Sequence, residues 1–390
     1  MFLKFINIKY MLKSIVLVIL LLFINTLPAQ TVSSVDIDNI ITKTPQRETV
    51  LKYYTNIHKA ERFILKENFK KASNAYFDAF EYIKNPFEMD LLNALECELL
   101  CKKSKDDRIG FIIKKIIEKT GEIPIVLSYN PYDAVFKDNE LENLIANYEA
   151  SIDSSFIKQI ELLVNTDQDI RHKSMTEHNG YAYNEYYKDT IQYLDSINYY
   201  KIIELIKNQG YISEELIGGS NGWNKMFIII NHNNQRNALI PILHESVVAG
   251  TFDARIFAGI LDICNYKFDN ELYISQSIWF INEGIFFTGK YNNNTLAKIN
   301  KRRSCIYLDS FNNYQDKISW SIMNPQYFFN FASVKYEMYL SDEEFYTLVL
   351  DYLSKKQNNT LLYFKNNEQE KRIINEAKEW DLQNKNTEKK

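Results

Sequence analysis

The apolar residues of this 390-residue chain recur mostly at helical spacing. Within 108–119, isoleucines occupy positions i, i+3, i+4 and i+7, a pattern that predicts a helix ended by Gly121. The stretch 223–230 has the same period, although its run of phenylalanine and isoleucine also fits a buried strand. Further helices are predicted for 86–103, 140–164, 191–206, 235–249 and 253–264. The pattern therefore predicts a mainly α protein.

Residues 52–85 resemble a tetratricopeptide-like helical hairpin. Small residues at Ala60, Ala72 and Ala79 would let two antiparallel helices approach closely, and larger side chains between them would fill the gap. One such unit cannot bury its own faces, and the predicted helix at 86–103 supplies a neighbour. We therefore expect a helical-repeat-like module over 46–150. An ordinary helical bundle with chance spacing is the alternative.

The remainder of the chain divides into two larger regions. Residues 151–276 read as an α-helical central domain. Aromatic and β-branched residues at 303–308 and 331–340 predict a few strands, so 277–380 is expected to be a smaller mixed α+β region. Within it, Ser341 and Glu344 form a capping box that predicts a helix start. The polar tail 381–390 is expected to be disordered.

The first 29 residues have the features of a secretory signal peptide. Three lysines precede an unbroken apolar run at 15–24, which is shorter than the roughly 20 residues that a membrane helix needs. We expect cleavage before Gln30 and a linker over 30–45. The product would be exported to the periplasm or the cell exterior, with no integral membrane segment after signal cleavage.

Charge and cysteine usage exclude several classes of protein. Without residues 1–29 the chain keeps 43 basic and 50 acidic side chains, a net charge of −7, and no basic stripe that would bind nucleic acid. Four cysteines are too few for a fold built on disulfides, and only Cys264 with Cys305 is a pair worth testing. No cysteine has a second ligand at metal-binding spacing, so we expect no metal and no cofactor.

Candidate chemistry concentrates between residues 226 and 276. His232 ends an apolar segment, where it is placed either to transfer protons or, with Asn231, to cap the end of the helix. Asp167, Arg171 and Asp262 are expected either to hold three helices together as a buried ion-pair network or to line a cleft. In the second case Gln168 and Gln276 would line it with them.

Several short polar signatures over about 156–276 resemble the bacterial domain of unknown function 6624. They are Asp167-Gln168 with Arg171, Asp195 with Asn198 and Lys201, Asn231-His232, Ala258 to Asp262, and Tyr273 with Ser275 and Gln276. The chain departs from that family at Glu271, Ile263 and Ile274, which stand where the family has glutamine, arginine and glycine. The resemblance implies a helical fold and a set of positions, but no reaction.

Two functions fit these observations. The first is an exported scaffold whose helical-repeat module binds a protein or peptide. The second is an enzyme, possibly a hydrolase, that uses His232 as general acid or base. Its substrate would be oriented by Asp262, Tyr273 and Gln276 as the main partners, and bound with Asp167, Gln168, Arg171, Asn231 and Ser275. A third possibility is that 226–276 is only a structural core and that the C-terminal mixed region holds the function.

Overall fold

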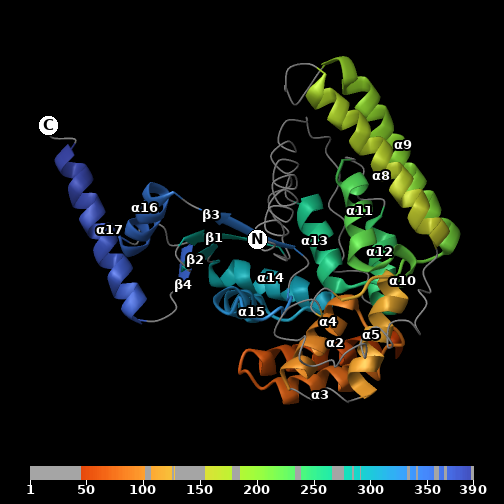
Figure 1. Ribbon diagram of the computed structural model, residues 1–390, viewed down its shortest axis with the longest axis horizontal. Helices are drawn as coiled ribbons and strands as arrows, with labels where there is room; N and C mark the ends of the chain where they lie inside the picture. The colour runs from red at the N-terminus through yellow and green to blue at the C-terminus, as the bar shows by residue number, and fades with distance from the viewer. Residues whose placement is uncertain are drawn as a thin grey trace. The chain divides into compact units, whose positions relative to one another are not determined.

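The fold is given by a computed structural model that describes residues 45–101, 107–124, 127, 154–177, 185–232, 239–265, 276–282, 285–289, 291–331, 334–339, 341–354, 360–363 and 367–387. All of these residues belong to one compact unit, 40–390. The expected signal peptide and nearly all of the expected linker lie outside the described residues. Helices predominate throughout, which confirms the prediction of a mainly α protein (Figure 1).

Four consecutive helices follow the linker: α2 (Pro45–Ile64), α3 (Phe69–Phe80), α4 (Glu88–Leu100) and α5 (Asp107–Thr120). Each packs against the next, and the four lie together as one group (Figure 1). The alanines singled out between 60 and 79 are fully buried, and the isoleucine stripe of α5 is buried as predicted. Helix α4 is buried on almost every side, although its sequence includes Asp90, Glu96 and Glu98. These buried acids need cationic partners.

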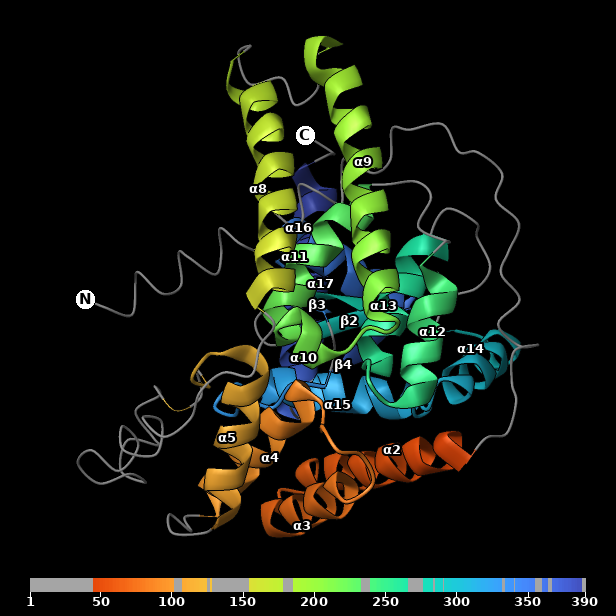
Figure 2. The ribbon, with the colours of Figure 1, turned by 90° about the vertical axis from the view of Figure 1, so that its right-hand side faces the viewer.

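The central region consists of α8 (Ser154–Thr176), α9 (Glu185–Gln209), α10 (Glu214–Ile217), α11 (Gly219–His232), α12 (Ile240–Ala249) and α13 (Ala254–Asn265). Helices α8 and α9 lie side by side as a long pair, and α11 packs against both (Figure 2). The segment 223–230 is therefore helix and not strand. Gly250 ends α12 in the left-handed conformation that its position after a helix predicts.

Four short strands form one sheet with the order β3-β1-β2-β4. Strand β1 (Gln276–Asn282) runs antiparallel to β2 (Ile285–Gly289) and parallel to β3 (Val334–Tyr339), and β2 runs antiparallel to β4 (Thr360–Tyr363). The other elements here are α14 (Asn293–Cys305), α15 (Phe311–Met323), α16 (Asp342–Leu353) and α17 (Asn367–Thr387). The region expected to be mixed α+β is thus itself mainly helical.

Two local predictions in this region were wrong and two were confirmed, one of them the strand expected within 331–340, which is β3. The strand expected at 303–308 is instead the end of α14 and a turn, because Arg303 points inward, donates to the Asp309 carbonyl at 2.7 Å and lies over the Tyr314 ring. The tail expected to be disordered continues α17 to residue 387. The capping box is present, with the backbone N–H of Glu344 donating to the Ser341 hydroxyl at 3.3 Å.

Reciprocal helix caps join α2–α5 to the central helices. The Glu88 carboxylate of α4 accepts from the backbone N–H of Ser220 in the first turn of α11 at 2.6 Å. In return, Glu214 accepts from the backbone N–H of Glu88 at the start of α4 at 2.8 Å. Lys119 pairs with Glu214 at 2.8 Å and with Glu215 at 2.9 Å. Each acid thus satisfies unpaired N–H groups of a helix in the other region.

The helices of the described residues were also compared with the length and hydropathy of a membrane span. None of them combines enough length with enough apolar character to cross a bilayer.

Candidate functional site

A buried histidine–carboxylate pair lies where α8 and α11 meet. Nδ1 of His232, the last residue of α11, is 3.1 Å from Oδ2 and 3.2 Å from Oδ1 of Asp167 on α8. The His232 and Asp167 side chains are 7% and 1% exposed. One ring nitrogen of His232 therefore contacts a carboxylate of a neighbouring helix that is withdrawn from water.

Arg171 holds this pair from the next turn of α8. Its Nε is 3.2 Å from Oδ2 of Asp167, its Nη2 is 3.4 Å from Oδ1, and the same Nη2 forms an ion pair with Asp195 on α9. The side-chain amide of Gln168 donates to Oδ2 of Asp167 at 2.7 Å. Charge-assisted hydrogen bonds of this kind are stronger than neutral ones. They tie α8, α9 and α11 together at one point.

The two carboxyl groups of this cluster have opposite pKa shifts. Burial alone would raise the pKa of Asp167, but the hydrogen bond from His232 and the charges of His232 and Arg171 outweigh it and lower the pKa to about 2. Burial raises the pKa of Asp195 to about 6, although Arg171 lies beside it. Asp167 is therefore ionised at neutral pH. Two carboxyls whose pKa values are shifted in opposite directions are typical of acid–base sites, although structural ion pairs also produce such shifts.

The contact with Asp167 fixes which nitrogen of His232 carries the proton. An ionised carboxylate only accepts hydrogen bonds, so Nδ1 is the nitrogen that donates. In the neutral ring Nε2 then carries a lone pair and is the basic atom. Nε2 is buried and has no hydrogen-bond partner among the described residues. A buried polar atom left unpaired costs about 1–3 kcal/mol and calls for an explanation.

Two further buried polar atoms without a partner among the described residues lie on the helices that carry this cluster. They are Oγ of Ser174 on α8 and Nδ2 of Asn198 on α9. Ser174 is three residues after Arg171, and Asn198 is three residues after Asp195, so each shares a helix face with a member of the cluster. These faces of α8 and α9 thus carry buried polar groups that have no partner among the described residues.

The structure brings together only part of the predicted site. Asp167, Gln168, Arg171 and His232 converge as described. Of the predicted ion-pair network, Asp167 and Arg171 pair with each other, and His232 and Asp195 are the further members of the cluster. Asp262 is buried in α13, and burial and the Asp262 charge raise the pKa of Tyr291. Three predicted partners stay untested: Tyr273 and Ser275 lie outside the described residues, as does the side chain of Gln276 in β1.

Other sequence predictions can be compared with this geometry. Asn231 is buried next to His232 in α11. The side chain of Cys264 lies outside the described residues, so the suggested disulfide with Cys305 stays a prediction. Asp195 belonged to the family signature but not to our predicted site, and Ser174 was missed. Helical spacing from Arg171 could have indicated Ser174, but a serine on a helix face carries no signal of its own.

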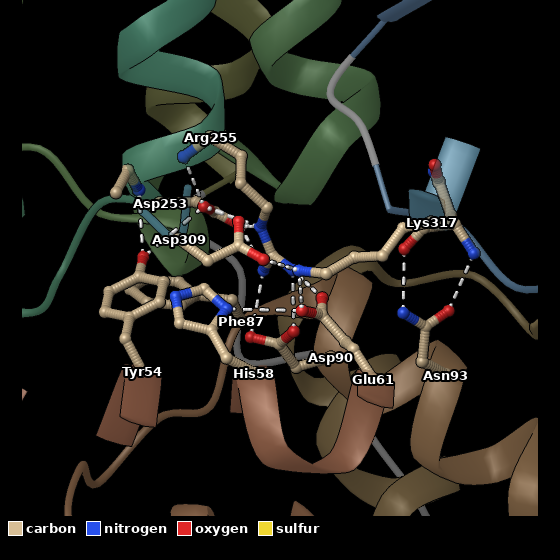
Figure 3. A network of polar contacts seen from close by, with 12 residues as sticks. Tyr54, His58, Glu61, Phe87, Asp90, Asn93, Asp253, Arg255, Asp309 and Lys317 are labelled. Carbon is tan, nitrogen blue, oxygen red and sulfur yellow. Dashed lines mark hydrogen bonds and ion pairs between the residues drawn. The ribbon is translucent and has the colours of Figure 1, made fainter. Parts of the chain in front are cut away.

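A second buried charge cluster, which sequence reasoning missed, joins α2 and α4 to α13 and α15 (Figure 3). The Arg255 guanidinium makes two hydrogen bonds with Asp90, at 2.8 and 2.9 Å, and three with Asp253, at 2.6–3.0 Å. Lys317 pairs with Glu61 and, at 2.6 Å, with Asp309. All six side chains are less than one-tenth exposed. The signal that could have revealed them is the set of acids within the apolar pattern of α4.

Among the described residues, two groups of side chains have the composition of a metal site: His58, Glu61 and Asp309 in the second cluster, and Asp167, Asp195 and His232 in the first. In each, a basic side chain of the protein already lies between the two carboxylates. Lys317 pairs with both acids of one group, and Arg171 pairs with both acids of the other. A divalent cation would have to approach against that positive charge, so the pattern favours ion pairing over metal binding.

The chain matches no family model, no curated protein and no solved structure.

Proposed function

We propose that the protein is an exported enzyme that uses His232 as a general acid–base catalyst, with Asp167 as the positioning residue that holds its ring. One observation carries the proposal: a buried carboxylate fixes Nδ1 of His232 while Nε2 is buried without a partner among the described residues. A base held by a third group and offering its other nitrogen is the arrangement that proton transfer requires.

In this reaction Nε2 takes a proton from the substrate, or from a water molecule that attacks it, and returns that proton to the leaving group. The ionised Asp167 stabilises the imidazolium formed between these two steps, because it stays negatively charged while the ring becomes positive. Arg171 keeps Asp167 ionised and in place. Ser174 and Asn198 would contact uncharged polar groups of the substrate, consistent with hydrolysis of a small polar molecule.

The resemblance over 156–276 supports the same site. The signatures around Asp167, Asp195 and His232 are far apart in sequence, yet all three side chains belong to one cluster. We propose that this region is a divergent copy of the domain of unknown function 6624 whose retained signatures form the acid–base centre. Helix packing alone would not require these polar positions to converge.

A substrate-independent test is the tautomer of His232. Long-range ¹H–¹⁵N spectra of the ¹⁵N-labelled protein at alkaline pH should show a proton on Nδ1 and none on Nε2. In the Asp167→Asn variant this preference should weaken, because the amide can either accept a hydrogen bond from a protonated Nδ1 or donate one to an unprotonated Nδ1. A proton on Nε2 in the wild type would contradict the proposed role of that atom.

The catalytic test compares His232 on α11 with a second histidine, His172 on α8. The protein without residues 1–29 is assayed on chromogenic esters, amides, glycosides and phosphate esters. For any substrate turned over, His232→Gln should lower kcat by at least about 100-fold, the usual contribution of a general base. The matched control is His172→Gln, since His172 is exposed on α8 next to Arg171, and its activity should be unchanged. Equal activity of both variants, or no turnover of any substrate class, would count against the proposal.

The scaffold hypothesis remains the second candidate, and the contacts of each of α2–α5 with the next support it. The faces of α2 and α4, however, are covered by Arg255, Lys317 and the segment that follows α15. A partner could not use that surface while this segment occupies it.

A further inference from the structure

The segment after α15 lies on the helical-repeat module through its main chain. The side-chain amide of Asn93 on α4 donates to the backbone carbonyl of Asn330 at 2.7 Å and accepts from the backbone N–H of the same residue at 2.8 Å (Figure 3). One turn further along α4, Glu96 accepts from the backbone N–H of Phe328 at 3.2 Å. Three hydrogen bonds from two residues of one helix thus bind the backbone of a segment more than 230 residues away.

The contacts of this segment alternate along the chain. The backbones of residues 328 and 330 face α4, whereas the rings of residues 327, 329 and 331 stack with one another and with Trp320. An alternation with period two is that of an extended chain. The backbone N–H of Tyr327 closes a turn with the Asn324 carbonyl at 3.1 Å, and residues 328–331 after it lie on α4 as an extended peptide would.

An aromatic side chain of α3 also contacts this segment. The Phe69 ring lies 5.3 Å from the Tyr327 ring and stacks on the Phe329 ring at 5.7 Å. Phe329 is buried, while Asn330 is exposed at its side chain although its backbone is held. Recognition thus combines main-chain hydrogen bonds, which ignore sequence, with a preference for aromatic residues at every second position.

We infer that Phe69, Asn93 and Glu96 form a binding site for an extended peptide of a partner protein with aromatic residues at alternate positions, which residues 327–331 occupy in cis. This inference is independent of the acid–base centre, since none of its residues belongs to that cluster. It gives the helical-repeat module a definite ligand class, and it explains why the module carries an asparagine fully buried among apolar residues of α4.

Because residues 327–331 of the same chain occupy the site, a partner peptide must compete with them. A tethered segment competes at an effective concentration on the order of 1 mM. The apparent Kd of a partner peptide rises in inverse proportion to the fraction of time that the site is open. The wild-type protein should therefore bind a peptide weakly, and loosening the segment should uncover the site.

The experiment uses a fluorescent peptide with the sequence of residues 324–333 and fluorescence anisotropy. The segment is loosened in the full chain by Phe329→Ala with Asn330→Pro, which removes one stacked ring and the N–H that Asn93 accepts. This variant should bind the peptide with a Kd at least tenfold below that of the wild type. Adding Asn93→Ala should raise the Kd at least tenfold again. Circular dichroism checks that each variant is folded.

The matched control is the same peptide with proline at the position of Asn330. It keeps the aromatic residues but lacks the critical N–H, so it should bind at least tenfold more weakly. Equal binding of the two peptides, or no binding to a folded, loosened variant, would overturn the inference. A loosened variant that forms dimers without binding the peptide would overturn it as well, because the occupant would then be a second copy of this chain.

Discussion

The ion pairs of Arg255 offer the sharpest test of how the regions are held together. In Arg255→Met a side chain of similar length replaces the guanidinium, so packing is largely kept while Asp90 and Asp253 lose their cation. Both acids are fully buried. Breaking a buried pair from one side typically costs about 3–5 kcal/mol, because an uncompensated charge is left behind. We expect a loss of that size here.

The melting temperature gives the readout. For a unit of about 350 residues, 1 kcal/mol corresponds to about 1–2 °C, since the shift per kcal/mol falls with chain length. Arg255→Met should therefore lower the Tm by about 3–10 °C in differential scanning calorimetry. The control is Arg372→Met, which breaks the exposed pair with Glu376 on α17. Exposed pairs contribute about 0–1 kcal/mol, so its Tm should change by about 2 °C or less.

The pH dependence separates lost charge from lost packing. Burial raises the pKa of Asp90 even beside Arg255, whose charge lowers it, and without Arg255 the pKa rises further. When a carboxyl has a higher pKa in the folded protein than its unfolded value of about 3.9, the free energy of unfolding falls as pH rises between the two values. The deficit of Arg255→Met should thus grow from pH 4 to pH 7 and shrink when Asp90→Asn is added. A deficit equal to that of Arg372→Met, or one independent of pH, would refute the reasoning.

Three further predictions concern the junctions around α4, α5 and α12. Lys119→Met should lower the Tm more at pH 8 than at pH 5. Burial raises the pKa of Glu214 to about 7, so the pair that the substitution removes is an ion pair at pH 8 but not at pH 5. Equal losses at both pH values would contradict this. Glu88→Ala should cost about 1 kcal/mol in urea unfolding by uncapping α11, and a neutral result would argue against that cap. Gly250→Ala should cost more than Gly210→Ala: both glycines have positive φ, but only at position 250 would a Cβ lie 2.8 Å from a neighbouring side chain. Equal losses would show that backbone strain alone sets the cost.

The sequence predicted elements well where the signal is local. The isoleucine stripe of α5, the glycine after α12 and the capping box before α16 each depend on neighbours within a turn or two. The strand expected at 303–308 failed because burial of Arg303 against Tyr314, not β propensity, decides that stretch. The tail failed because a polar sequence was taken for a disordered one, although α16 and α17 pack through a small apolar cluster around Ile373.

The candidate site could be predicted only in part, for a different reason. The short polar signatures indicated Asp167, Arg171 and His232 but could not say that they meet, because their convergence depends on how three helices pack. The partners of Asp90 were even harder to predict from the sequence. Buried acids in α4 imply cations elsewhere, yet nothing in the spacing of residues along the chain connects α4 with Arg255, 165 residues further on.

A comparison of His58 with His232 tests whether His232 has a structural role or the proposed catalytic one. Both ring nitrogens of His58 have acceptors: Nδ1 is 3.2 Å from Glu61, and Nε2 is 2.9 Å from the Tyr307 carbonyl. His58→Gln must abandon one of them and should cost about 1–3 kcal/mol in urea unfolding. His232→Gln can keep its contact with Asp167 through the amide and loses no other partner among the described residues, so it should cost less than about 1 kcal/mol. If His232→Gln destabilises the fold as much as His58→Gln does, Nε2 of His232 supports the structure, and the acid–base proposal fails with it.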